Sequence, residues 1–127
     1  MIRVRLTATR RIEAPVDQVW GHLVETATWP AWGPTVRGIN GPRRIEEGTT
    51  GLVSTVIGLK LPFEITELIE GVSWSWKVAG IPATGHGVEA THDGSTVVRF
   101  DCPWWAPFYL PVLRRGLTRL DDLVRGT

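Results

Sequence analysis

The chain has 127 residues, of which 43% are hydrophobic and 21% charged, and its formal net charge is +1 at pH 7. A chain of this length can bury roughly two thirds of its unfolded surface as one domain, so we expect a single domain over residues 1–127. A near-neutral charge with scattered basic residues excludes a nucleic-acid partner from our expectations. No segment approaches the roughly 20 apolar residues that span a bilayer, and the N-terminus lacks the apolar run of a signal peptide. We therefore expect a cytoplasmic protein without stable membrane insertion.

Cysteine and histidine offer little for metal or redox chemistry. Cys102 is the only cysteine, which excludes an intramolecular disulfide and a cysteine-based zinc site. His86 and His92 are expected on one face of one strand, where a separation of roughly 20 Å prevents them from sharing a metal. His22 falls outside the apolar stripe of the first predicted helix and is expected to be exposed. We predict no metal and no cofactor.

The N-terminal part predicts a strand followed by short helices. Residues 2–12 alternate apolar with polar side chains, which is the period of a half-buried strand. Pro15 stands where the first position of a helix would be. The apolar side chains after it recur at helical spacing and give this helix one apolar face, namely Val16, Val19, Trp20 and Leu23. Pro30 and Pro34 then restrict the chain to a turn or a second, very short helix.

Residues 35–103 predict an antiparallel meander of about six strands, because turn signals recur about every ten residues. The strongest hairpin signal is Asp93-Gly94, since a tight turn needs a positive φ there. Alternation places Trp74 and Trp76 on one face of their strand. In the last strand four side chains share a face, namely Thr96, Val98, Phe100 and Cys102.

The C-terminal segment changes to the period of a helix. Its apolar residues follow 4-3-4 spacing and form a single stripe of Leu113, Leu117, Leu120 and Val124. A sheet buries one face, and helices are the only large elements here that can cover it. A long twisted sheet curls around such a helix and leaves space at the helix ends. The element order therefore predicts an α+β fold with a ligand-sized space.

Two motifs near the N-terminus resemble a known family. Residues 12–20 read IEAPVDQVW and residues 29–32 read WPAW. In that order they resemble the opening of the polyketide cyclase/dehydratase branch of the START/Bet v 1-like (SRPBCC) superfamily, and residues 62–67 (PFEITE) are a weaker echo. The resemblance implies a helix-grip fold, in which a curved antiparallel sheet wraps around a long C-terminal helix, with one or two short helices after strand 1. It also implies an apolar cavity between sheet and helix.

We expect the following side chains to line that cavity: Trp32, Phe63, Ile65, Trp74, Trp76, His86, Val88, Phe100, Tyr109, Leu113 and Leu117. Members of the superfamily often direct an aromatic or polar residue inward at the place of His86. His86 therefore either touches a ligand or is a polar residue at a strand end. Tyr109 is expected to offer its hydroxyl to a ligand.

Catalytic candidates are few, and no motif fixes their geometry. Strict alternation from Ile65 directs Glu67 into the interior, where a carboxylate would be protonated, paired or functional. A bulge or strand end would instead bring Glu67 to water. Glu67, His86 and Tyr109 are the candidates for acid–base catalysis. Cys102 lacks a neighbour that would lower its pKa, so we interpret it as a small buried hydrophobe.

Two connecting stretches, residues 56–62 and 104–111, are more apolar than loops usually are. They either form the lips of a cavity mouth or pack on each other as core.

Binding needs only an apolar cavity, whereas catalysis needs a matched acid–base pair. We therefore expect a protein that binds a lipid-, polyketide- or isoprenoid-like ligand. The alternative is a polyketide cyclase/aromatase or dehydratase, hence a lyase or isomerase, and a third class is an interaction protein with an aromatic docking patch. The sequence is compatible with a monomer or a homodimer, and it does not identify the ligand.

Overall fold

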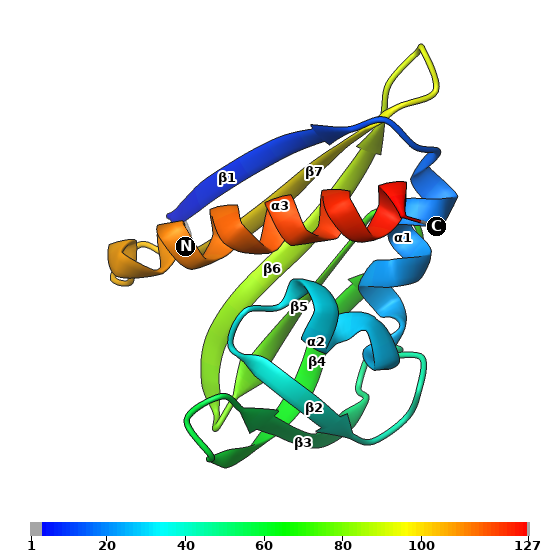
Figure 1. Cartoon of the computed structure of the whole chain (residues 1–127). Helices are drawn as coiled ribbons and strands as arrows, with labels where there is room; N and C mark the ends of the chain where they lie inside the picture. Colours follow the sequence, from blue (N-terminus) through cyan, green and yellow to red (C-terminus); the bar gives the residue numbers. More distant parts are fainter. Residues whose placement is uncertain (1–3, 127) are drawn as a thin grey trace.

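The computed structural model describes residues 4–126 and contains a seven-stranded antiparallel sheet whose concave face holds one long helix (Figure 1). The strand order is β1-β7-β6-β5-β4-β3-β2, so every strand pairs with its neighbour in the sequence except β1, which pairs with β7. The strands are β1 (Arg5–Ile12), β2 (Val36–Asn40), β3 (Thr50–Thr55), β4 (Lys60–Ile69), β5 (Ser73–Val78), β6 (Ile81–Ala90) and β7 (Thr96–Pro103).

The helices are α1 (Val16–Val24), α2 (Trp29–Trp32) and α3 (Leu110–Arg125), and short 3₁₀ turns precede α2 and α3. The predicted helix-grip α+β fold is confirmed, including the short helices after the first strand. One detail differs, because Pro15 is the N-cap of α1 and not its first helical residue. Its ψ of 148° is the extended conformation that an N-cap adopts.

The predicted faces of the last strand and the last helix are buried as expected. Thr96, Val98, Phe100 and Cys102 are all inaccessible or nearly so, as are the four apolar residues of the α3 stripe. The β6–β7 turn contains Gly94 at φ +86°, as the hairpin prediction requires. Ile2, the first residue of the predicted N-terminal strand pattern, lies outside the described residues.

Helix α3 is held close to the sheet and to α2. A Cβ atom on Gly116 would lie 3.2 Å from the carbonyl oxygen of Trp32 and 3.3 Å from the ring of Phe100, so glycine permits this approach. Farther along α3, the buried carboxylate of Asp121 accepts a hydrogen bond of 2.7 Å from Nε of Arg10 on β1. Packing and an ion pair therefore fix both halves of α3.

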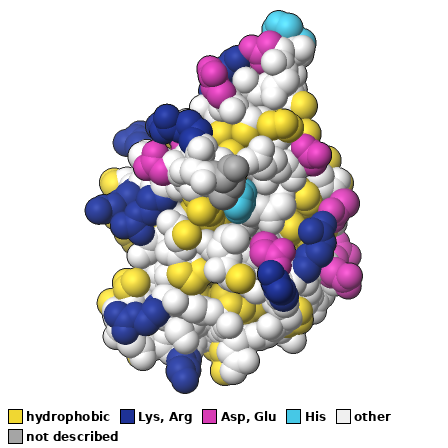
Figure 2. Space-filling view, turned by 45° about the vertical axis from the view of Figure 1, so that its right-hand side comes forward, with side chains coloured by type: hydrophobic (Ala, Val, Ile, Leu, Met, Phe, Trp, Pro, Cys, Tyr) yellow, Lys and Arg dark blue, Asp and Glu magenta, His cyan; other side chains and the backbone are white. Residues whose placement is uncertain are grey.

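The antiparallel order collects the connections at two ends of the sheet. The first end has the α2–β2, β3–β4, β5–β6 and β7–α3 connections, and the second end has the others together with the last turn of α3. Most acidic side chains lie toward the second end, namely Glu13, Asp17, Glu25, Glu46, Glu47, Glu70, Glu89, Asp93, Asp121 and Asp122. In Figure 2 the acidic side chains gather mostly at the top and right, and basic ones along the left. Charge is therefore unevenly distributed along the molecule.

Within residues 4–126, no helix combines the length and the hydrophobicity that crossing a bilayer would require.

Candidate functional site

Tryptophan side chains fill much of the space between the sheet and the helices. The indole rings of Trp29 and Trp74 stack with centroids 4.9 Å apart and planes 7° apart. Trp76 contacts Trp29 edge-on at 5.3 Å, and Trp32 lies 5.4 Å from the ring of Phe100. Aromatic pairs in these geometries stabilise a core beyond the area that they bury. Packed aromatic side chains therefore fill much of the concave side of the sheet, and only part of it is open.

The open space that remains is a cleft with two adjoining chambers. The deep chamber has a volume of about 50 Å³ and lies against α2, β5, β6 and the start of α3. The outer chamber has a volume of about 320 Å³ and lies over β3, the β3–β4 turn and the ends of β5 and β6. Five residues line both chambers and mark their junction, namely Thr35, Val36, Trp76, Thr84 and Tyr109. The cleft therefore leads from the first end of the sheet inward toward His86.

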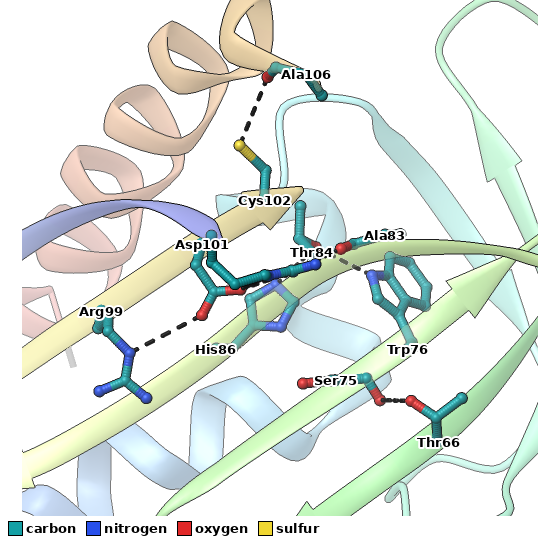
Figure 3. Close-up of polar contacts among 11 residues, drawn as sticks. Thr66, Ser75, Trp76, Ala83, Thr84, His86, Arg99, Asp101, Cys102 and Ala106 are labelled. Carbon is teal, nitrogen blue, oxygen red and sulfur yellow. Dashed lines mark hydrogen bonds and ion pairs between the residues drawn. The ribbon is translucent and has the colours of Figure 1, made fainter. Parts of the chain in front are cut away.

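Three hydroxyl groups lie at the junction of the chambers. The hydroxyls of Tyr109 and Thr35 lie 3.1 Å apart and share a hydrogen bond. Thr84 accepts a 3.0 Å hydrogen bond from Nε1 of Trp76, and its oxygen lies 3.2 Å from Nε2 of His86 (Figure 3). A pair of hydroxyls uses one of its two hydrogens internally, so a hydrogen and several lone pairs remain for a ligand.

His86 is the innermost titratable group of the cleft. Its ring stacks on Trp74 with centroids 4.0 Å apart, and it is 5% exposed. Burial lowers the pKa of His86 from 6.5 to about 3, because the charged imidazolium would lose its hydration. No described residue makes a well-formed hydrogen bond with Nδ1 of His86 or with Nε1 of Trp74. The imidazole is therefore neutral at physiological pH.

The walls of the cleft carry no formal charge. Among the described residues that line either chamber there is no Asp, Glu, Lys or Arg. The described residues also contain no group of three or more His, Cys, Asp or Glu side chains that could hold a metal ion. The cleft therefore suits an uncharged apolar molecule, with most of its hydroxyl groups at the junction of the two chambers.

Sequence comparison places the chain in a family. Residues 3–125 match the family described as polyketide cyclase / dehydrase and lipid transport. The chain belongs to this family. No curated protein matches the sequence significantly.

Solved structures share the fold of this polyketide cyclase/dehydrase family member at low sequence identity. Protein MLL2253 from Mesorhizobium loti has a TM-score of 0.78 at 12% identity, with 98% of each chain covered. Protein jhp0584 from Helicobacter pylori has a TM-score of 0.77 at 11% identity, covering 97% of this chain and 89% of its own. Protein NE0264 from Nitrosomonas europaea has a TM-score of 0.72 at 16% identity, covering 97% and 95%. At such identities the likeness shows the fold alone.

The structure of this family member brings some of the predicted cavity residues to the cleft. Those that line it are Trp32, Trp74, Trp76, His86, Phe100, Tyr109 and Leu113. The others, Phe63, Ile65, Val88 and Leu117, are buried in the core and line neither chamber. Sequence reasoning missed Thr35, Val36 and Thr84. Thr84 could have been found, because it shares the inward face of β6 with His86.

Glu67 lies outside the cleft. A bulge between Ile65 and Glu67 shifts the register of β4 against β5, so that Leu68 takes the inward position opposite Trp74. Glu67 is exposed as a result. Strict alternation therefore gave the wrong face for Glu67, and the alternative of a bulge is correct.

The other histidines also differ from expectation. His92 is exposed in the turn after β6, so it does not share a strand with His86. His22 is partly buried, and this burial lowers its pKa. In the turn after α1 the hydroxyl of Thr28 donates a 2.6 Å hydrogen bond to the carbonyl oxygen of His22.

Cys102 behaves as the buried hydrophobe that its surroundings predict. Its Sγ donates a hydrogen bond of 3.5 Å to the carbonyl oxygen of Ala106, and burial raises the pKa of the thiol. A raised pKa lowers the thiolate fraction on which nucleophilic chemistry depends.

Both apolar stretches carry exposed side chains, although Ala106 is buried and Leu61, Tyr109 and Leu110 pack against the core. Val56 and Ile57 form part of the wall of the outer chamber, and Tyr109 is where the second stretch reaches the cleft. Trp104, Trp105 and Phe108 point away from the core into solvent.

Proposed function

We propose that this protein binds a small, uncharged, hydrophobic ligand in the cleft. The observation that carries the proposal is an apolar outer chamber of about 320 Å³ with three hydroxyl groups at its inner end. The hydroxyl of Thr55, which also lines this chamber, is bonded to the backbone of Leu59. Ligand sites in proteins are typically about 300–1,000 Å³, mostly apolar, with a few polar groups that fix orientation. The volume and the chemistry of the outer chamber agree with that pattern.

The two chambers would receive different parts of the ligand. The body of the ligand lies in the outer chamber against the indole of Trp76. The deep chamber, at about 50 Å³, admits only a small group such as a carbonyl or hydroxyl oxygen. Tyr109, Thr35 and Thr84 are placed to hydrogen-bond that oxygen. A lipid-, polyketide- or isoprenoid-like molecule with one terminal oxygen function fits this division.

Catalysis as a cyclase or dehydratase is the second function that the family description raises. Proton transfer between carbon and oxygen needs an acid and a base matched to the working pH. With a pKa of about 3, His86 is a weak base at neutral pH, and no described lining residue is a carboxylate. Binding requires neither group, so it is the function that we propose.

The first test is native mass spectrometry of freshly purified protein, compared with the same sample denatured. We expect an extra mass of a few hundred daltons that is lost on denaturation, because an apolar ligand that fills the outer chamber would survive gentle ionisation. A reproducible apo mass would count against tight carriage of a host ligand.

The second test uses the neutral dye N-phenyl-1-naphthylamine as a probe of the cleft. Trp76→Ala removes the aromatic wall shared by both chambers and should weaken dye binding roughly tenfold. Ser75→Ala is the matched control, because Ser75 lies on the same strand but lines neither chamber. The affinities are measured by dye fluorescence. If the two folded variants bind the dye equally well, the cleft is not the binding site.

A further inference from the structure

Large apolar side chains are exposed at the first end of the sheet, around the opening of the outer chamber. Ile57 is 77% exposed, Phe108 is 72% exposed and Trp104 is 63% exposed. Together with their exposed apolar neighbours they form what we call the mouth patch: Val56, Ile57, Leu59, Ile81, Trp104, Trp105 and Phe108. An apolar cluster of this kind on a folded surface indicates a surface that something covers.

Three separate connections contribute to the mouth patch. The β3–β4 turn supplies Val56 to Leu59, the start of β6 supplies Ile81, and the segment after β7 supplies the three aromatic residues. The register places these connections at one end, since Thr55 pairs with Val36 and Val78 pairs with Ile81. The patch is therefore a composite surface built by the fold, and Val56 and Ile57 join it to the cleft.

Toward this end Arg5 pairs with Asp101 at 2.7 Å, but several other basic side chains have no ion-pair partner among the described residues. Arg37 lies at the start of β2, Lys60 at the start of β4, and Arg114 and Arg115 in the first turns of α3. None of the four forms an ion pair with a described residue.

At the second end the basic side chains are neutralised. Arg10 pairs with Asp121, Arg11 with Asp93, Arg43 with Glu25, and Arg44 with Glu70. The unpaired cations and the exposed apolar side chains therefore share the end of the molecule that has few carboxylates.

We propose that the mouth patch docks this protein on an anionic lipid bilayer surface. Tryptophan and phenylalanine side chains favour the interface between headgroups and acyl chains, and unpaired Lys and Arg attract anionic headgroups. A second copy of this chain is the less suitable occupant, because a two-fold interface would bring the unpaired cations of both copies together. Docking is peripheral, through side chains of turns.

Such docking goes beyond the proposed ligand binding, because it needs only the surface and not the cleft. It would also direct the opening of the outer chamber toward the acyl chains. An apolar ligand could then pass between bilayer and cleft without crossing water.

Vesicle flotation tests the proposal with purified protein. We expect binding to vesicles of phosphatidylcholine mixed with phosphatidylglycerol to exceed binding to pure phosphatidylcholine by roughly tenfold or more, and to weaken as salt is added. Absence of binding to the anionic vesicles at low salt would overturn the proposal. Binding that is equal for both vesicle types would overturn the role of the cations.

Matched variants locate the surface that binds. The triple variant Trp104→Ser, Trp105→Ser, Phe108→Ser, which changes residues that line neither chamber, should lose vesicle binding. Ile69→Ser with Val72→Ser, which alters exposed apolar residues at the second end, should retain it. Ligand or dye binding by the triple variant distinguishes a failed docking surface from a failed cleft.

A second pair of variants tests the charges. Arg114→Gln with Arg115→Gln should weaken binding to the anionic vesicles, and Arg43→Gln with Arg44→Gln, which makes the same change in net charge, should not.

Light scattering on the wild type and the triple variant tests whether the mouth patch is instead an interface between two copies of the chain. Conversion of a dimer to a monomer by these substitutions, with vesicle binding unchanged, would assign the patch to a protein interface and overturn the proposal.

Discussion

His86 shows how one buried side chain links the cleft to stability. Its ring lies among the rings of Trp74, Trp32 and Phe100, and the hydroxyl of Thr84 lies 3.2 Å from its Nε2. Such surroundings accept a neutral imidazole and exclude a charged one. The protein therefore keeps a histidine that cannot take up a proton until strongly acidic pH.

The sign of the resulting pH dependence follows from the two pKa values of His86. The folded-state pKa, about 3, lies below the ordinary value of 6.5, so between these values the unfolded chain binds a proton that the folded chain does not. The free energy of unfolding should therefore fall as the pH drops through this window, by up to about 1.4 kcal/mol per pH unit. Above pH 6.5 His86 is neutral in both the folded and the unfolded chain, so the free energy of unfolding keeps its full value with respect to this group. Urea unfolding across this pH range measures it.

The variant His86→Gln isolates the effect, because glutamine does not titrate. Its unfolding free energy should depend on pH less steeply than that of the wild type over the same window. His92→Gln, at an exposed turn position, should keep the wild-type slope. If His86→Gln also keeps the wild-type slope, the acid sensitivity arises from other groups.

The contrast between His86 and Glu67 shows where residue-level prediction stops. The family resemblance, rather than alternation, suggested an inward His86, and the side chain is buried on β6, which pairs with β7 without interruption. Alternation along β4 failed at Glu67, because a bulge adds one residue and turns the following side chains to the other face. The amino-acid sequence around residue 66 does not distinguish a regular strand from a bulged one, because the bulge arises from the register of two strands against each other.

At the scale of elements, the attachment of α3 depends more on the carboxylate of Asp121 than on that of its neighbour Asp122. Asp121 is buried and pairs with Arg10 on β1 and with Arg125 in its own helix. Asp122 is exposed and pairs with Arg125 alone. The two residues therefore form a natural comparison between a buried and an exposed ion pair.

We expect Asp121→Asn to lower the free energy of unfolding by about 1.5–3 kcal/mol, the range for a hydrogen bond to a charged group with limited hydration. Asp122→Asn should change it by less than about 1 kcal/mol, as for an exposed pair. Thermal or urea unfolding of the two variants measures the difference. Equal losses would show that the contact between α3 and β1 rests on apolar packing alone.

Strand β3 depends on a glycine for its approach to β2. A Cβ atom on Gly51 would lie 2.6 Å from the carbonyl oxygen of Asn40 and 2.9 Å from the ring of Phe63, and neither the backbone nor the buried ring can yield cheaply. A Cβ atom on Gly38, in β2, would meet nothing within 4 Å.

Gly51→Ala should therefore destabilise the protein by about 1–3 kcal/mol, the usual cost of overpacking a well-packed site. Gly38→Ala, as the control, should have a much smaller effect. Denaturant midpoints of the two variants check this expectation. A neutral Gly51→Ala would mean that the β2 edge can move away from the sheet without loss.

For the whole molecule, the sequence predicted the architecture better than the free space. The motif around Pro15, the meander of turn signals and the apolar stripe from Leu113 depend on local chemistry, and the fold follows from their order. The size of the cleft depends instead on how Trp29, Trp32 and Trp74 pack against one another. That packing joins segments far apart in the chain, and side-chain patterns along one strand do not reveal it.

The pairing of β1 with β7 has a consequence for how the protein is made. Strand β1 leaves the ribosome before β7, and the partner of Arg5, Pro103, is synthesised 98 residues later. At about 5–20 residues per second, the first strand lacks its partner for roughly 5 to 20 s. Helix α3, which covers the concave face, follows later still. The nascent chain therefore carries an unpaired edge on β1 until β7 has been synthesised, and the sheet is completed only after that point.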